Sequence, residues 1–109
     1  MYGGDEKEKK GDFRFVVDDN AVYHTLSDFH SEDARKKFQQ LQQKEKDLQT
    51  MNESLVKIRD NYASGNQSLK EKLAPGILDR EKRVRELYEE IEKLTLDIRN
   101  TEIKKLKNL

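Results

Sequence analysis

The residues that decide the fold are ILDREKRVRELYEEIEKLTLDI, which run from Ile77 to Ile98. Large β-branched side chains recur in this stretch every seven residues, and leucines fill the intermediate positions, which is the heptad pattern of a coiled coil. Residues at these intervals share one face of an α-helix. The stretch therefore predicts a helix that packs along this stripe against a second helix. The stripe consists of Ile77, Val84, Leu87, Ile91, Leu94 and Ile98.

A second stripe precedes it in the chain. The Ser31 side chain can accept hydrogen bonds from the free N–H groups of a first helical turn, and Glu32 and Asp33 carry the negative charge that a helix N-terminus favours. We therefore expect a long helix to begin near residues 27–31. Its apolar face repeats at intervals of seven with intermediate positions, again as in a coiled coil. This face consists of Leu41, Leu48, Met51, Leu55, Ile58 and Tyr62.

The segment between the two stripes contains the breaks that reverse the chain. Residues 61–68 include Gly65 among polar residues, which should end or loosen the first helix. The only proline is Pro75, followed by Gly76. Because a proline in the first turn of a helix sacrifices no intrahelical hydrogen bond, we expect the second helix to start at Pro75. The pattern predicts a reversal near residues 64–76 and an antiparallel helical hairpin over residues 31–109.

The N-terminal third has a different character. Residues 1–12 hold three glycines among charges and predict a flexible tail. Residues 13–30 predict a small head segment, because the aromatic and β-branched residues 13–17 suit a short strand and residues 18–20 suit a turn. Residues 21–26 fit either a second strand of a β-hairpin or the start of a helix, and we favour the hairpin. The expected fold class is mainly α: an antiparallel two-helix coiled-coil hairpin with a short N-terminal strand or β-hairpin segment.

We also expect the head segment to cover the open end of the helical hairpin, where the heptads weaken. The covering apolar residues would be Phe13, Phe15, Val17, Tyr23, Leu26 and Phe29. The residues that they cover would be Phe38, Leu41, Ile103, Leu106 and Leu109.

Composition limits both the core and the partners. Hydrophobic residues make up 33% of the 109 residues and charged residues 40%, against roughly 45–50% and 25% in typical globular chains, which predicts a thin fold. The 22 basic residues are balanced by 22 acidic ones, so the basic excess typical of nucleic-acid or anionic-lipid binding is missing. No apolar run approaches the roughly 20 residues of a membrane span. We expect protein partners, no nucleic acid and no direct membrane span.

The chain as printed also shows no targeting signal, because its first ten residues lack the apolar region of a signal peptide. We expect a cytoplasmic protein by default, or a periplasmic or lipid-anchored one if a signal has been removed.

Side chains that could carry chemistry are few. The chain has no cysteine, no glycine-rich elbow around a serine and no phosphate loop, so we predict no enzyme and no cofactor. His24 and His30 with Asp28 and Asp33 could supply metal ligands, but their spacing matches no metal motif. We therefore predict no metal site and interpret these four residues as surface or capping groups.

Two stretches carry a resemblance to a known family. FRFVVD, residues 13–18, followed by FQQLQQKEKDLQ, residues 38–49, resembles the start of the OmpH/Skp-like periplasmic chaperones. The resemblance implies a strand-built trimerisation body and helical arms that hold unfolded membrane proteins. The arms of this chain differ from that family in having no basic excess.

The function predicted from these observations is that of a non-enzymatic structural or adaptor protein that acts through coiled-coil contacts with other proteins. The alternative is an OmpH/Skp-like holdase chaperone that clamps unfolded clients with its helical arms. A thin hairpin buries only one stripe per helix, so we expect a homo-oligomer, preferably a dimer. Apolar residues outside the main stripes, which a monomer would leave uncovered, include Leu73, Leu78, Tyr88, Leu96 and Ile103.

Overall fold

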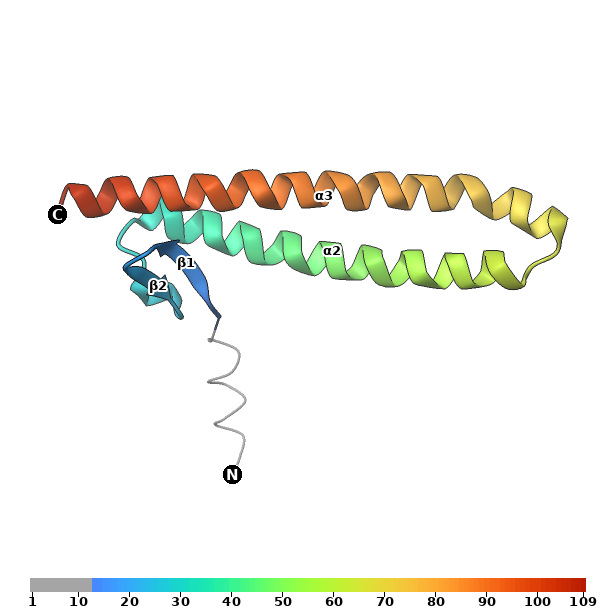
Figure 1. Ribbon diagram of the computed structural model, residues 1–109, viewed down its shortest axis with the longest axis horizontal. Helices are drawn as coiled ribbons and strands as arrows, with labels where there is room; N and C mark the ends of the chain where they lie inside the picture. The colour runs from blue at the N-terminus through green and yellow to red at the C-terminus, as the bar shows by residue number, and fades with distance from the viewer. Residues whose placement is uncertain (1–12) are drawn as a thin grey trace, which may run out of the picture. The chain divides into compact units, whose positions relative to one another are not determined.

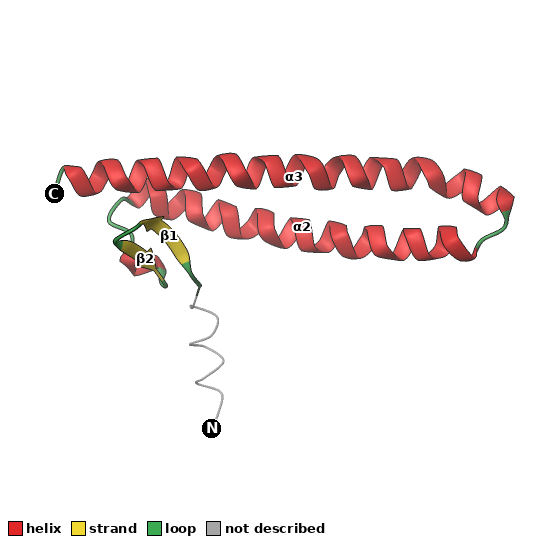
Figure 2. Cartoon of the chain, viewed as in Figure 1, coloured by secondary structure: helices red, strands yellow, loops and turns green. Residues whose placement is uncertain are grey.

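The computed structural model describes residues 13–109, and the expected flexible tail over residues 1–12 lies outside the described residues. Two long helices, α2 (Glu32–Ser64) and α3 (Gln67–Lys107), pack against each other, and 79% of the described residues are helical. A two-stranded antiparallel sheet of β1 (Phe15–Asp18) and β2 (Ala21–Tyr23) precedes them (Figures 1 and 2). The predicted fold class, a helical hairpin with an N-terminal β-hairpin, is confirmed.

The chain forms two compact units. The head unit comprises residues 13–39 and 94–109 of the described chain, and the hairpin unit comprises residues 40–93. The head is therefore built from both ends of the described chain, whereas the hairpin unit is continuous in sequence.

The β-hairpin of the head follows the expected alternation. Phe15 pairs with Tyr23 and Val16 with Val22, and the first pair is buried while the second faces solvent. The expected turn at residues 18–20 forms, because the Asp18 carboxylate accepts a hydrogen bond from the backbone N–H of Asn20 at 2.8 Å. The preference for a strand over residues 21–26 is confirmed for β2, after which a short 3₁₀ turn, η1 (Leu26–Asp28), leads toward α2.

Aromatic rings form the core of the head. The Phe38 ring lies 4.4 Å from Phe13, 5.3 Å from Phe15 and 5.2 Å from Phe29, measured between ring centroids. The Tyr23 ring meets Phe29 edge-on at 4.9 Å, a favoured geometry for aromatic pairs. The N-terminal segment thus covers Phe38, as expected.

One residue that we expected the head to cover remains open. The side chain of Leu109 is 75% exposed, because α3 ends at Lys107 and the last residue lies past it.

The start of α2 is capped as the sequence predicts. Ser31 precedes the helix, and its hydroxyl oxygen accepts a hydrogen bond from the Ala34 N–H at 3.1 Å. Glu32 and Asp33 occupy the first turn, where negative charge is favourable. Both the capping residue and the helix start are therefore confirmed.

The hairpin unit combines an apolar core with ion pairs between its helices. Leu55 from α2 and Leu87 from α3 are buried. Alongside them, Lys44 pairs with Glu90 at 2.9 Å and the Arg80 guanidinium donates to the Ser54 hydroxyl at 2.8 Å. These contacts join the two helices at several points along the unit.

The reversal occurs at the early edge of the expected range. Helix α2 ends at Ser64, and the Asn66 carboxamide oxygen accepts a hydrogen bond from the Leu69 N–H at 2.9 Å at the start of α3. The expected helix start at Pro75 is wrong, because α3 begins at Gln67 and contains Pro75. The cap supplied by Asn66 starts the helix before the proline, which is then tolerated within it.

The residue after this proline sits close to the other helix. A methyl group on Gly76 would come within 3.0 Å of the Ile58 Cδ1 atom. The absence of a side chain at Gly76 therefore permits close packing of α3 against Ile58 of α2.

Candidate functional site

The predicted interaction and packing residues differ in how deeply the structure places them. Three of the twelve are half-buried on α2 and four on α3, namely Leu48, Met51, Ile58, Ile77, Val84, Ile91 and Leu94. The buried ones are Leu41, Leu55, Leu87 and Ile98. Tyr62 is exposed, and the Lys70 ammonium lies over its ring at 5.5 Å from the centroid. Leu41 begins the first stripe and Ile98 ends the second, so burial is not confined to the centre of the stripes, and the half-buried members leave partly open apolar edges.

Several large apolar side chains of the hairpin unit face solvent outside the stripes. Val56 of α2 and Tyr88 of α3 are each 55% exposed, and Leu78 of α3 is 65% exposed. Leu78 and Tyr88 belong to the residues that the sequence marks as surplus to the packing stripe. Exposed apolar groups of this size are the material from which protein interfaces are made.

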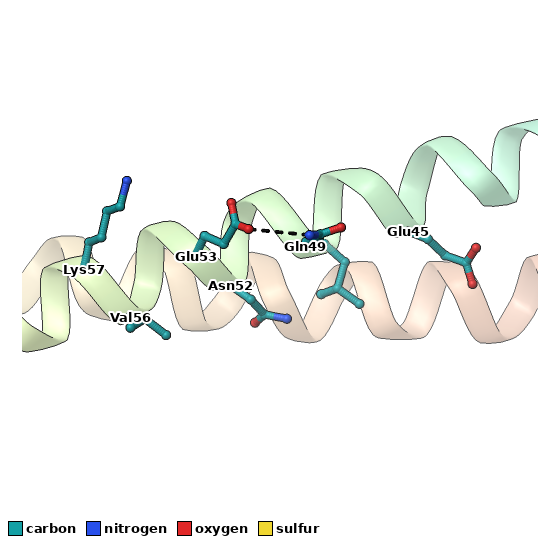
Figure 3. Close-up of a pocket in the computed structure, with 7 residues that line it drawn as sticks. Glu45, Gln49, Asn52, Glu53, Val56 and Lys57 are labelled. Carbon is teal, nitrogen blue, oxygen red and sulfur yellow. Dashed lines mark hydrogen bonds between the residues drawn. The ribbon is translucent and has the colours of Figure 1, made fainter. Parts of the chain in front are cut away.

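An open groove runs along α2 within the hairpin unit and has a volume of about 540 Å³. Figure 3 shows Asn52 and Val56 on one side of the helix and Lys57 on the other. All of the lining residues belong to α2, so a single helix supplies the whole groove. They recur at intervals of three and four, the spacing of neighbours on a helix surface. These residues are Glu45, Leu48, Gln49, Asn52, Glu53, Val56 and Lys57.

The carboxylate at one end of this groove, Glu45, forms no ion pair with another described residue. Residue 45 is exposed as a whole, yet partial desolvation raises the pKa of the Glu45 carboxyl above its ordinary value. A cationic group placed at this end of the groove would therefore have a carboxylate to pair with.

The head holds the most deeply buried charged group among the described residues, and the sequence analysis missed it. The Glu102 side chain of α3 has no exposed surface. Its carboxylate accepts hydrogen bonds from the Tyr23 hydroxyl at 2.6 Å, from the His30 N–H at 2.9 Å and from the Ser31 N–H at 3.0 Å. The His30 Nδ1 atom lies 3.0 Å from the same carboxylate. One carboxylate thus fastens β2 and the entry to α2 onto α3.

This environment acts on two ionisable groups in opposite directions. Burial alone would raise the pKa of Glu102, but the hydrogen bonds from Tyr23, His30 and Ser31 outweigh burial and lower that pKa below its ordinary value. Burial and the adjacent carboxylate raise the pKa of Tyr23 above its ordinary value. The pair is therefore held as an ionised carboxylate and a neutral phenol at neutral pH.

The lowered pKa of Glu102 predicts that the head loses stability in acid. An unfolded glutamate titrates near pH 4.3, so the contribution is fully present above about pH 4.3 and is lost as the pH falls through the lower pKa of the folded state. We expect the urea concentration at the midpoint of unfolding, measured by amide exchange in the head, to decrease as the pH is lowered below about 4.3. In Glu102→Gln this part of the pH dependence of stability should disappear, leaving the part due to Asp28, whose pKa is lowered by backbone hydrogen bonds from His24 and Thr25. An unchanged slope in Glu102→Gln would contradict the assignment.

The residues considered as metal ligands have structural partners instead. The Asp28 carboxylate accepts hydrogen bonds from the backbone N–H groups of His24 and Thr25 at 2.8 and 3.0 Å and so caps η1. The His24 Nδ1 atom lies 2.8 Å from the Phe13 carbonyl oxygen. Asp33 pairs with a lysine one turn along α2 at 3.2 Å. Across residues 13–109 no group of three or more His, Cys, Asp or Glu side chains could hold a metal ion.

No helix within the described part of the chain combines the length and apolar character needed to cross a membrane. Comparison of the chain with protein-family models, with curated proteins and with solved structures gives no match.

Proposed function

We propose that this chain is a non-enzymatic structural or adaptor protein that binds a folded protein partner through its helical hairpin and acts as a homodimer. The observation that carries the proposal is the set of apolar side chains that the hairpin unit leaves open although its core is closed. Leu87 is 1% exposed, whereas Leu78 and Tyr88 on the same helix are 65% and 55% exposed. Side chains that contribute nothing to the core but remain large and apolar are typical of an interface.

The charge pattern supports a protein partner. Basic and acidic residues are equal in number, and inter-helix pairs such as Lys44 with Glu90 and Arg59 with Glu81 use both signs together. A surface of mixed charge around apolar groups matches the polar rim and apolar centre of protein interfaces.

To test for a partner, the full chain is immobilised and used to recover a binding protein from the native cell. That protein is then purified and mixed with the chain. We expect one folded protein that binds at a fixed ratio, measured by light scattering of the purified complex. A Leu78→Glu, Tyr88→Glu double variant should lose binding with helicity unchanged, because both side chains lie outside the core. Lys72→Glu, an equal change in charge at an exposed position of α3 on another side of the helix, is the matched control.

Two results would contradict the adaptor proposal. One is the absence of a partner with fixed stoichiometry. The other is suppression of aggregation of several unrelated unfolded proteins at equal molar ratio, which would favour the chaperone alternative.

The homodimer has its own measurement. Light scattering at micromolar concentration should give twice the chain mass of 12.9 kDa. A monomer mass with a cooperative thermal transition would show that the hairpin is stable alone.

A further inference from the structure

Five side chains on one face of α2 have a spacing that is symmetric about the central residue. Starting from Glu45, the side chains on this face follow at intervals of three, four, four and three residues, and Asn52 stands at the centre. These intervals keep all five residues on one face of a helix with 3.6 residues per turn. The face consists of Glu45, Leu48, Asn52, Val56 and Arg59. Four of them line the groove along α2, and Arg59 follows one turn after Val56.

We propose that two copies of the chain associate through this face, with their α2 helices antiparallel and Asn52 at the two-fold axis. In a two-fold interface the same patch meets itself, so that residue i contacts residue j and residue j contacts residue i. The palindromic spacing then places Leu48 of one copy against Val56 of the other, and Glu45 against Arg59. The inference rests on the homodimer proposed above and names its surface.

The apolar pair explains why this face should be covered. Leu48 is half-buried and Val56 is 55% exposed, and both border the groove. A second α2 helix laid in the groove would form two such contacts, with the valine of each copy on the leucine of the other, one on each side of the axis. Removing these apolar surfaces from water favours association.

The central asparagine suits a two-fold axis. Its carboxamide has both donor and acceptor groups, so two copies of Asn52 can satisfy each other across the axis. A single polar asparagine in an otherwise apolar seam also fixes register and orientation, because a shifted alignment would bury the amide without a partner. Asn52 is half-buried in the hairpin unit already.

Charge selects the antiparallel orientation. Glu45 and Arg59 stand fourteen residues apart along the helix, or about 21 Å at 1.5 Å per residue. A parallel pair would bring each of these charges against its own copy, whereas the antiparallel pair brings opposite charges together. Arg59 contacts Glu81 at 2.5 Å, its side chain is 52% exposed, and a guanidinium has five N–H donors in all. Glu45, partly desolvated and outside the ion pairs of the described chain, gains a cation that the described part of its own copy does not supply.

The test uses the absence of native cysteine, since any disulfide in a single-cysteine variant must join two chains. Asn52→Cys should give a covalent dimer in high yield under mild oxidation, because the two-fold axis brings its side chains together. Thr50→Cys, an exposed position on the opposite side of α2, is the matched control and should stay largely uncoupled. Circular dichroism of each variant verifies that the helices are intact.

The orientation is tested by mixing. Leu48→Cys and Val56→Cys chains should couple with each other when mixed, and each should couple poorly with itself. A parallel pair would give the reverse result, with strong self-coupling of both variants, and would overturn the proposal.

Charge reversal gives a second readout that does not depend on cysteine. Glu45→Arg and Arg59→Glu should each raise the dimer dissociation constant by roughly tenfold, since each places like charges together in two symmetric positions. The double variant should return to within roughly threefold of the original. Failure of the double variant to recover would count against the pairing of residues 45 and 59.

The outcomes separate the two proposals. A monomer mass for the unmodified chain would rule out both the homodimer and the surface proposed for it. A dimer mass with no coupling at residue 52 removes only the surface assigned here.

Discussion

Glu102→Ala is expected to lower the free energy of unfolding of the head by at least about 3 kcal/mol, because it leaves several donors without an acceptor and each buried donor so left costs roughly 1–3 kcal/mol. The Glu102 carboxylate is fully buried and accepts hydrogen bonds from the Tyr23 hydroxyl and from the backbone N–H groups of His30 and Ser31. Alanine would leave these donors buried without an acceptor, which costs more than the bonds themselves contribute. Urea unfolding combined with hydrogen exchange at the His30 and Ser31 amides measures the effect directly.

Glu102→Gln is the matched control because it keeps the shape and one acceptor oxygen while removing the charge. We expect it to be destabilised less than Glu102→Ala, with the His30 and Ser31 amides partly protected. If Glu102→Ala unfolds at the same urea concentration as the original protein, the carboxylate does not hold the head together.

Leu87→Ala is expected to destabilise the hairpin unit by roughly 2–5 kcal/mol, the range for truncating a buried leucine. Leu87 is 1% exposed, so its removal leaves a cavity between the helices as well as losing apolar contact. Urea unfolding followed by circular dichroism at 222 nm reports the loss of helix.

Leu78 provides the control for this prediction. It is the same residue type on the same helix but is 65% exposed, so Leu78→Ala should change the free energy of unfolding by less than about 0.5 kcal/mol. Equal effects of the two substitutions would mean that residue 87 is not at the centre of the packing.

Local pattern was sufficient to predict much of the fold. The heptad stripes, the Ser31 cap and the alternation in residues 13–17 are signals carried by neighbouring residues, and each corresponds to an element of the structure. The expected helix start at Pro75 is wrong because the Asn66 side chain caps a helix that already begins at Gln67. The cap at Asn66 therefore determines where the helix begins, and Pro75 lies inside the helix.

Glu102 could not be recognised from its neighbours, because its hydrogen-bond partners lie 71–79 residues away along the chain. A signal was nevertheless present. Glu102 follows Ile98 by four residues and so lies on the side of α3 that carries the apolar stripe, next to residue 101, where the heptad itself would continue. A charged residue in such a position either ends the stripe or is buried with partners, and the structure shows the second.

The ion pairs of Arg83 illustrate a different limit. Arg83 follows Asp79 by four residues, a spacing that favours an ion pair within one helix, but its guanidinium contacts Glu86 at 3.4 Å and Glu90 at 3.1 Å. Glu90 also pairs with Lys44 of α2, so Arg83 contacts a carboxylate that lies between two cations. The spacing of charged residues predicts ion pairs within one helix, but it does not predict which charges of the neighbouring helix will lie beside them.

The division of the chain into a continuous hairpin unit and a head made from both ends has a consequence for biosynthesis. Residues 40–93 are continuous in sequence, so the contacts within the hairpin unit involve no residue that is translated after residue 93. The segment around Tyr23 and His30 is made early but must wait for Glu102, the acceptor of its hydrogen bonds. The first part of the described chain to be translated is thus among the last to fold, which reverses the order usual for proteins that fold from their N-terminus during synthesis.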